Sequence, residues 1–265
     1  MGILTAPARG DKTRLPLLNG RRVRGVVLGT FPGFDGRRAV VIATFKTSNR
    51  KTGDMAQIWI LRAAGNPLDA VANGTDGTVC GTCPHRSRAA GGAGTCYVNV
   101  AHAPLGVWKA WKAGRYAKWD GSDGQLEQLF EGRAVRFGAY GDPAILPAAL
   151  VGRIAALSSK WTGYTHAWTR SPEHRAYLMA SVDSPRERDN ARSHGWRTFR
   201  VAPLGAGPEA AGDGGREISC PASEEAGKKT TCDRCGLCAG QGRPAADVTI
   251  QAHGQGSRRV GLTVV

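Results

Sequence analysis

Seven cysteines are the residues of this chain with the clearest capacity for chemistry. They form two groups in the sequence, and both spacings are typical of metal sites. The first group is Cys80, Cys83 and Cys96, and the second is Cys220, Cys232, Cys235 and Cys238. Closely paired cysteines in a reducing compartment usually bind metal, so we expect all seven thiols to be metal ligands.

The two groups predict different chemistry. Four thiolates close the coordination of zinc or of an iron–sulfur cluster, which then has a structural or electron-carrying role. Three thiolates leave a position open for a small molecule, or for His85 or His102 if the metal is zinc. The spacing fits either metal, so a [4Fe-4S] cluster and Zn remain alternatives.

Two acids and a histidine follow predicted strands. Asp142 and Asp183 lie where such strands end, and active sites of parallel α/β sheets gather at that edge. His166 lies in a third strand pattern and is a candidate acid–base group. The alternatives are a helix N-cap for each aspartate and a core position for the histidine.

Composition points to a soluble, basic protein. The chain has 265 residues, with 36 Lys and Arg against 21 Asp and Glu, and its net charge is +15. This excess favours a polyanionic partner, DNA or a nucleotide above all, although a GC-rich genome would also enrich arginine. Without an apolar run of about 18 residues or a signal-peptide core, we expect no membrane and a cytoplasmic location, the host's cytoplasm if the protein is viral.

Strand and helix patterns alternate in the middle of the chain. The predicted strands are 23–30, 38–45, 56–61, 134–140, 162–168, 177–182, 198–201, 247–251 and 259–264, and the predicted helices are 105–116, 125–131, 146–159 and 186–194. This order predicts an α/β fold, either a partial (β/α) barrel or an open parallel sheet.

The chain divides by composition into three parts. Residues 1–37 form a basic N-terminal arm with edge strands, and residues 38–204 form the α/β core with the three-cysteine site. Residues 205–265 form a linker and a Cys-rich C-terminal metal-binding extension. Its Gly- and Ala-rich start, up to residue 216, predicts flexibility.

The segment 75–205 resembles divergent phage-encoded members of the radical S-adenosylmethionine (SAM) superfamily. The resemblance rests on Cys80, Cys83 and Cys96 followed by Tyr97, on Gly-Ala-Tyr-Gly-Asp at 138–142, on Tyr-Thr-His at 164–166, on Ser-Val-Asp-Ser at 181–184 and on the strand at 198–201. The common family spacing is Cys-x3-Cys-x2-Cys, from which this chain differs.

The resemblance implies a partial barrel whose three cysteines hold a [4Fe-4S] cluster that binds SAM. Gly138, Tyr140, Gly141 and Asp142 would then line the SAM site, with Asp183, His166 and Asp142 as catalytic candidates. The four C-terminal cysteines resemble an auxiliary-cluster extension. We therefore expect an isomerase or hydrogen-abstracting enzyme that acts on a modified base in phage DNA.

Two other functions fit the same residues. One is a zinc-containing, DNA guanine transglycosylase-like base-exchange enzyme with Asp183 as nucleophile, which the stretch 182–192 faintly resembles. The other is a non-enzymatic zinc protein that binds DNA, for example in replication. The oligomeric state is left open by the sequence.

Overall fold

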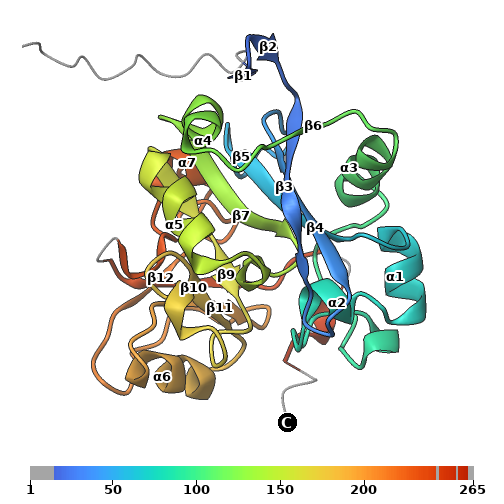
Figure 1. Ribbon diagram of the computed structural model, residues 1–265. Coiled ribbons are helices and arrows are strands. Elements are labelled where there is room, and N and C mark those ends of the chain that lie inside the picture. The colour runs from blue at the N-terminus through green and yellow to red at the C-terminus, as the bar shows by residue number, and fades with distance from the viewer. Residues whose placement is uncertain (1–14, 243–244, 255, 262–265) are drawn as a thin grey trace, which may run out of the picture.

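The computed structural model describes residues 15–242, 245–254 and 256–261, and it is an α/β fold with two open sheets (Figure 1). One sheet has the order β6-β3-β4-β5-β7-β8 and the other β12-β13-β11-β10-β9. The strands of the first are β3 (Gly25–Pro32), β4 (Arg38–Thr44), β5 (Ala56–Arg62), β6 (Ala117–Lys118), β7 (Ala134–Tyr140) and β8 (Lys160–Thr162). Those of the second are β9 (Tyr164–Thr165), β10 (Met179–Val182), β11 (Thr198–Ala202), β12 (Glu217–Ser219) and β13 (Asp247–Gln251), and β1 (Leu17–Leu18) pairs with β2 (Arg21–Arg22) in a hairpin.

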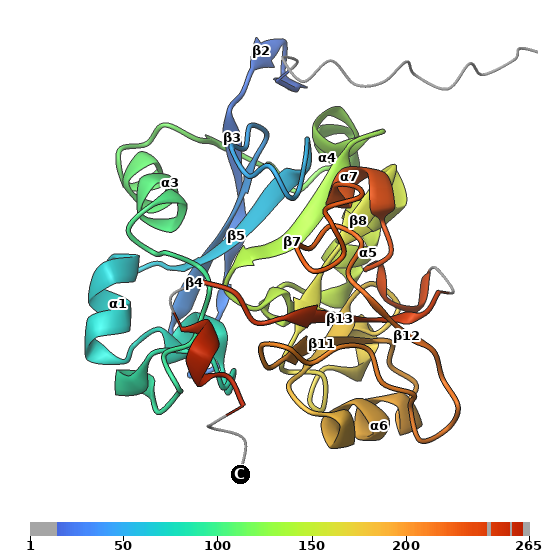
Figure 2. The same cartoon turned by 180° about the vertical axis from the view of Figure 1, so that it is seen from behind.

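The helices flank these sheets (Figures 1 and 2). They are α1 (Pro67–Asn73), α2 (Gly77–Cys80), α3 (Ala103–Lys112), α4 (Asp123–Phe130), α5 (Ala148–Leu157), α6 (Pro185–Ser193) and α7 (Cys232–Cys235). Ser122 caps α4 and Ser184 caps α6, each accepting a hydrogen bond from a backbone N–H in the first turn. These caps fix where the two helices begin.

Parallel pairing runs through most of both sheets. In the first sheet, β7 pairs in parallel with both β5 and β8. In the second sheet every neighbouring pair is parallel, in the order β12, β13, β11, β10 and β9. β8 and β9 are separated by Gly163 alone, whose N–H donates to the Cys238 carbonyl and whose carbonyl accepts from Met179. A side chain at Gly163 would collide with Leu178 at 2.5 Å, so the two sheets meet at a residue that must be small.

The apolar core explains why these strands form. β4 and β5 are buried along almost their whole length, as expected for strands covered on both faces, and they pack with β7, α4 and α5. A smaller core under the second sheet contains Met179, Phe199, Val248 and Ile250 together with Cys220 and Cys238. Two cysteines are thus part of the packing of the second sheet.

The α/β class is confirmed, and no closed barrel is found among the residues described. The second sheet is open and parallel, as predicted, whereas the first is mixed because β4 is antiparallel to both β3 and β5. β7 and β13 have the bounds predicted for them. The predicted strand 162–168 is wrong beyond residue 165. There, the Ala167 N–H donates to the Thr165 hydroxyl, and a turn begins at Ala167. The predicted strand 259–264 is wrong in its described part, which holds a 3-10 turn at Ser257–Arg259, and residues 262–265 lie outside the described residues.

The three predicted parts are not separate bodies. β3 lies inside the first sheet between β6 and β4, so it is not an edge strand; residues 1–14 of the predicted arm lie outside the described residues. The predicted linker is anchored, because Arg188 donates to the carbonyls of Glu209 and Ala210 and Ala211 is buried. β12 and β13 join β11 in one sheet, so the C-terminal part belongs to the core fold. No helix in the described ranges has the length and apolar character needed to cross a membrane.

Candidate functional site

One cavity of about 450 Å³ brings the two cysteine groups together. Its wall contains Cys83 and Cys96 of the first group and all of the second group, Cys220, Cys232, Cys235 and Cys238. The C-terminal segment that carries the second group passes across β7 and returns toward the first group (Figure 2). There, the ring of His253 lies 4.8 Å from that of Tyr97, and Arg259 donates to the Gly94 carbonyl. The topology therefore places two thiol clusters on the walls of one chamber.

The loop of the first group is held by buried polar contacts. Cys80 ends α2, and the Cys83 N–H donates to the Cys80 carbonyl at 3.1 Å. The buried carboxylate of Asp76 accepts from the Ser87 hydroxyl at 2.6 Å and from the Ser87 N–H at 2.9 Å. Cys96 is tied to the same loop through its N–H, which donates to the His85 carbonyl. The loop therefore has a defined shape although it contains little regular structure.

The second group is arranged by three separate anchors. The Cys220 N–H donates to Thr249 of β13, and the Cys232 N–H donates to the Lys51 carbonyl. The Cys238 carbonyl accepts from Gly163, where the two sheets meet. The segment is thereby attached to both sheets and to the loop between β4 and β5.

Burial favours the neutral form of several of these thiols, as the pKa values of Cys80, Cys232 and Cys238 show. It raises the pKa of Cys80, with Cys83 and Cys96 adding to the effect, and raises the pKa of Cys232 to about 11. Burial also raises the pKa of Cys238, and Cys220 contributes in the same direction. Mutual repulsion within each group is what a bound metal removes, because metal binding displaces the protons and neutralises the thiolates.

The spacing of the thiols bears on which metal fits. Among the described residues, the group of three ligand atoms lying within 4.8 Å of one another is His85, His166 and Asp183; the cysteine sulfurs form no such group. Tetrahedral zinc with bonds of about 2.3 Å brings its thiolates to about 3.8 Å. Among the described residues the thiols therefore outline no formed site for either metal, and an all-thiol donor set is compatible both with zinc and with an iron–sulfur cluster.

A buried hydroxyl beside the first group has no partner. Tyr140 ends β7 and is 5 % exposed, and its hydroxyl makes no hydrogen bond with any described residue. Burial raises the pKa of Tyr140, and the neighbouring Cys80 adds to this, so the group is a neutral donor. An unpaired buried donor costs about 1–3 kcal/mol, which a thiolate or sulfide acceptor at Cys80 would recover.

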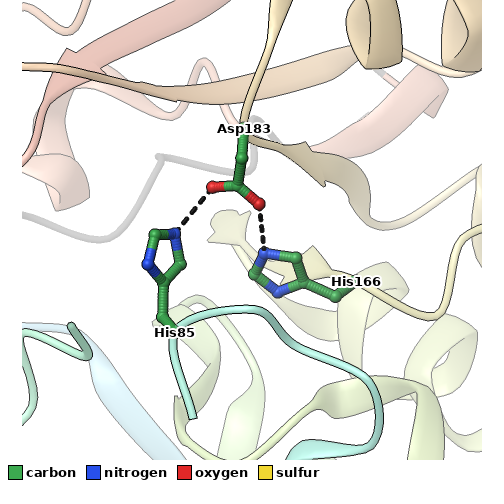
Figure 3. A group of neighbouring side chains, drawn as sticks. All are labelled: His85, His166 and Asp183. Carbon is green, nitrogen blue, oxygen red and sulfur yellow. Dashed lines mark hydrogen bonds and ion pairs between the residues drawn. The ribbon is translucent and has the colours of Figure 1, made fainter. Parts of the chain in front are cut away.

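Asp183 lies between two histidines, as Figure 3 shows. Its Oδ1 is 2.6 Å from His85 Nε2 and its Oδ2 is 3.3 Å from His166 Nε2. His166 Nε2 is also 4.0 Å from the Cys83 sulfur, and His85 Nδ1 is 2.6 Å from the Thr95 hydroxyl. Burial opposes ionisation of Asp183, but the hydrogen bonds from both histidines outweigh it and hold the pKa of Asp183 well below its usual range.

This arrangement differs from a nucleophile–base triad. In such a triad the histidine uses one ring nitrogen for the nucleophile and the other for the carboxylate. Here His166 presents the same nitrogen to Cys83 and to Asp183. Asp183 also is not the cap of α6, since Ser184 has that role. The three residues therefore form a network that orients the cysteine loop from the ends of β9 and β10.

Asp142 has the structural role that the sequence left open. Its Oδ1 accepts from the Ala144 N–H and its Oδ2 from the His166 N–H, both at 2.9 Å, and it caps a 3-10 turn. Its own N–H donates to Val79, next to Cys80. Gly141 approaches Ile60 too closely for any side chain. The predicted cofactor residues thus lie outside the wall of the cavity, on the other side of the cysteine loop. They are Gly138, Tyr140, Gly141 and Asp142.

One cavity residue, Arg136, was not singled out in the sequence, and another, Tyr164, was named there only as part of a motif. Arg136 lies on β7, is 9 % exposed, and donates from Nη2 to the Tyr97 hydroxyl at 2.5 Å. A charged residue inside the otherwise apolar run of residues 134–140 was the available signal. Tyr164, predicted as part of Tyr-Thr-His, also lines the cavity and stacks on Phe199 with ring centroids 4.1 Å apart.

Comparisons of the chain with protein-family models, with curated proteins and with solved structures give no match.

Proposed function

We propose that this protein is an iron–sulfur enzyme of the radical SAM type that abstracts a hydrogen atom from a base-bearing substrate. The observation that carries the proposal is that thiols of a three-cysteine group and of a four-cysteine group line one cavity of about 450 Å³. A site with an open coordination position and a closed site then face the same bound molecule. This division is what a reactive cluster and an accessory cluster require.

The order of elements supports the same proposal. The three-cysteine loop follows β5, and the turn of residues 138–142 follows β7, the next parallel strand of the sheet. The resemblance stated above implies this order for a partial (β/α) barrel. The row of parallel strands from β5 to β13, continued through Gly163, is compatible with such an incomplete barrel.

The residues of the chain have separate tasks in this proposal. Cys80, Cys83 and Cys96 would hold the reactive cluster, and the second cysteine group would hold the accessory one. When bound and supplied with one electron by an external reductant, the cluster would provide the reductive cleavage of SAM on which hydrogen abstraction from the substrate depends. In the cavity, Arg136 and Tyr97 would hold a polar part of the substrate.

The network of His85, His166 and Asp183 positions the ligands in this proposal. His166 Nε2 is directed at the Cys83 sulfur, and Asp183 fixes that ring. The same geometry gives less support to Asp183 as the nucleophile of a base-exchange enzyme. Both of its oxygens are engaged, and the carboxylate does not line the cavity.

Metal analysis of protein purified without oxygen tests the proposal. We expect iron and labile sulfide in equal amounts, and substitutions Cys83→Ser and Cys235→Ser should each remove about half of the iron because each disables one of two clusters. Thr82→Ala, an exposed neighbour of the first group, is the matched control and should leave the iron content unchanged. Stoichiometric zinc without sulfide would overturn the iron–sulfur assignment and favour a zinc protein.

Cofactor turnover tests the radical part separately. Reduced protein incubated with SAM should release 5′-deoxyadenosine, and Cys83→Ser should abolish this release while Cys235→Ser retains it in part. Iron-loaded wild-type protein that forms no 5′-deoxyadenosine would contradict the radical assignment and leave an electron-transfer or structural role for the clusters.

A further inference from the structure

A second cavity adjoins the first. It has a volume of about 670 Å³ and lies between the end of β4 with the following loop, the segment after Cys96, and α3 with the loop that follows it. Asn49, Tyr97 and Arg136 line both cavities, so the two spaces meet at these three residues. A molecule bound in the outer cavity therefore has a neighbouring opening to the thiol-lined one.

The outer cavity is basic. Arg24, Lys46 and Arg115 are exposed on its wall, and Arg136 lies at its inner end. No Asp or Glu is among the described residues that line it, and none of the exposed three has an acidic partner there. Cations held without counter-charges around one hollow attract a molecule with several negative charges.

Aromatic side chains accompany these charges. Trp59 forms part of the wall, fixed by a hydrogen bond from its Nε1 to the Thr44 hydroxyl at 2.8 Å. Tyr116 packs against Gly25, and Tyr97 is 48 % exposed. A basic groove with aromatic faces is the combination by which proteins hold single-stranded nucleic acid, through phosphates and base stacking.

The junction between the cavities contains a buried cation, Arg136. The guanidinium of Arg136 is almost fully buried, and the Tyr97 hydroxyl is its hydrogen-bond partner. A planar guanidinium binds two phosphate oxygens, and this one is reached from the outer cavity. A phosphate held there directs the attached base either over the Tyr97 ring or past it, toward the thiols.

We infer that the outer cavity binds a single strand of nucleic acid, with phosphates at Arg24, Lys46 and Arg115, and that one nucleotide passes Tyr97 and Arg136 so that its base lies between the cysteine groups. This inference rests on the proposed function for what happens to that base. The binding step itself depends only on the residues of the groove. Unstacking is inexpensive in a single strand, which suits delivery of one base into a pocket.

Fluorescence anisotropy with a single-stranded DNA of about ten nucleotides tests the inference, since single-strand sites span roughly 4–16 nucleotides. Affinity should fall steeply with salt concentration because phosphate contacts release counterions. Lys46→Ala and Arg115→Ala should each weaken binding several-fold at low salt and reduce the slope of log K against log salt by about 0.7. Arg186→Ala is the matched control, because it removes one exposed positive charge on α6, outside both cavities.

The buried arginine needs a pair of variants. Arg136→Lys retains the charge and should retain most of the affinity, whereas Arg136→Met removes the charge at similar volume and should weaken binding by tenfold or more. Thermal unfolding followed by circular dichroism shows whether either variant is folded. If Arg136→Met does not fold, the surface variants Lys46→Ala and Arg115→Ala still decide the question.

The outcomes separate this inference from the proposed function. Binding that is independent of salt, or an Arg186→Ala loss equal to that of Arg115→Ala, would overturn the groove. If a chain that holds no iron binds the strand, the groove is supported and the radical chemistry is contradicted. If the chain forms 5′-deoxyadenosine but binds no strand, the radical chemistry is supported and the groove is contradicted. RNA of the same sequence shows which sugar the groove prefers, and failure of both strands contradicts the inference.

Discussion

The hydroxyl of Tyr140 is the most informative single group of the molecule. It is buried beside Cys80 without a hydrogen-bond partner, and this burial is unfavourable in the metal-free chain. A hydrogen bond to an acceptor at Cys80 would make the same position favourable. Tyr140→Phe should therefore leave the metal-free protein as stable as the wild type, or more stable by about 1–3 kcal/mol, in urea denaturation. In the iron-loaded protein the same variant should lower the reduction potential, since hydrogen bonds to cluster sulfurs raise it.

The opposite result would assign Tyr140 to the core alone. A variant that loses stability without metal, and whose loaded form has an unchanged potential and iron content, would show that the hydroxyl interacts with protein groups and not with the cluster. Trp196→Phe, a similarly buried aromatic that lines neither cavity, provides a comparison for the general cost of altering the core.

At the same scale, the sequence predicted some of the site and missed the rest. The two cysteine groups were predicted from their spacing, which is a local signal, and their binding of metal stays a prediction. The contact of Asp183 with His85 and His166 was not, because the three residues come from loops that only the folded sheets bring together. Asp142 was placed at the right strand end, but the same position suits a cap and a ligand, and only the contacts of its carboxylate distinguish them.

Among the elements, β12 shows how a short strand is secured by charge. The side chain of Glu217 is fully buried and accepts from Arg200 Nε at 2.9 Å and Nη2 at 2.7 Å, while Arg188 lies 3.6 Å away. Glu217→Gln removes the one fully buried carboxylate from Arg200 and Arg188, which then keep only the more exposed Glu209 and Asp189, and we expect a loss of about 3 kcal/mol in the free energy of unfolding.

Glu209→Gln is the control for this prediction. Glu209 also pairs with Arg200, at 3.2 Å, but its side chain is half exposed, so the loss should stay below about 1 kcal/mol. Equal losses for the two variants, measured by urea denaturation, would mean that burial of Glu217 does not govern the strength of its pairs.

Element prediction succeeded where local patterns agree with burial. β7 and β13 have β-branched residues and clear turn signals at their ends, and their bounds were predicted. α1 and α2 were missed because the segment around them is rich in Gly and Ala, and their starts depend on Asn66 and on the fold of the cysteine loop. The predicted linker failed for a different reason, since its backbone carbonyls are bound by buried arginines that lie elsewhere in the sequence.

Across the whole molecule, the two cores depend on the cysteines to different degrees. The large core of β3, β4, β5, β7, α4 and α5 is built from apolar side chains, with Cys80 only at its margin. The small core includes Cys220 and Cys238 among few apolar residues, and their thiols are buried. If the second group holds metal, as proposed, that metal would contribute to the folding of the second sheet, while the first sheet has enough apolar burial of its own.

Removal of metal should consequently loosen one part of the protein before the other. With a chelator under reducing conditions, we expect trypsin to cleave first at Lys228, Lys229 and Arg234, which lie within the second cysteine segment, while the large core persists. Denaturation of the chelated chain should then proceed in two steps, and that of the loaded chain in one, when followed by circular dichroism and by cleavage. Arg186, exposed on α6, is the reference cleavage site within the described fold. If trypsin cleaves at Arg186 as fast as at Lys229, the second sheet unfolds as a unit. Its cysteines then do not determine the order of unfolding.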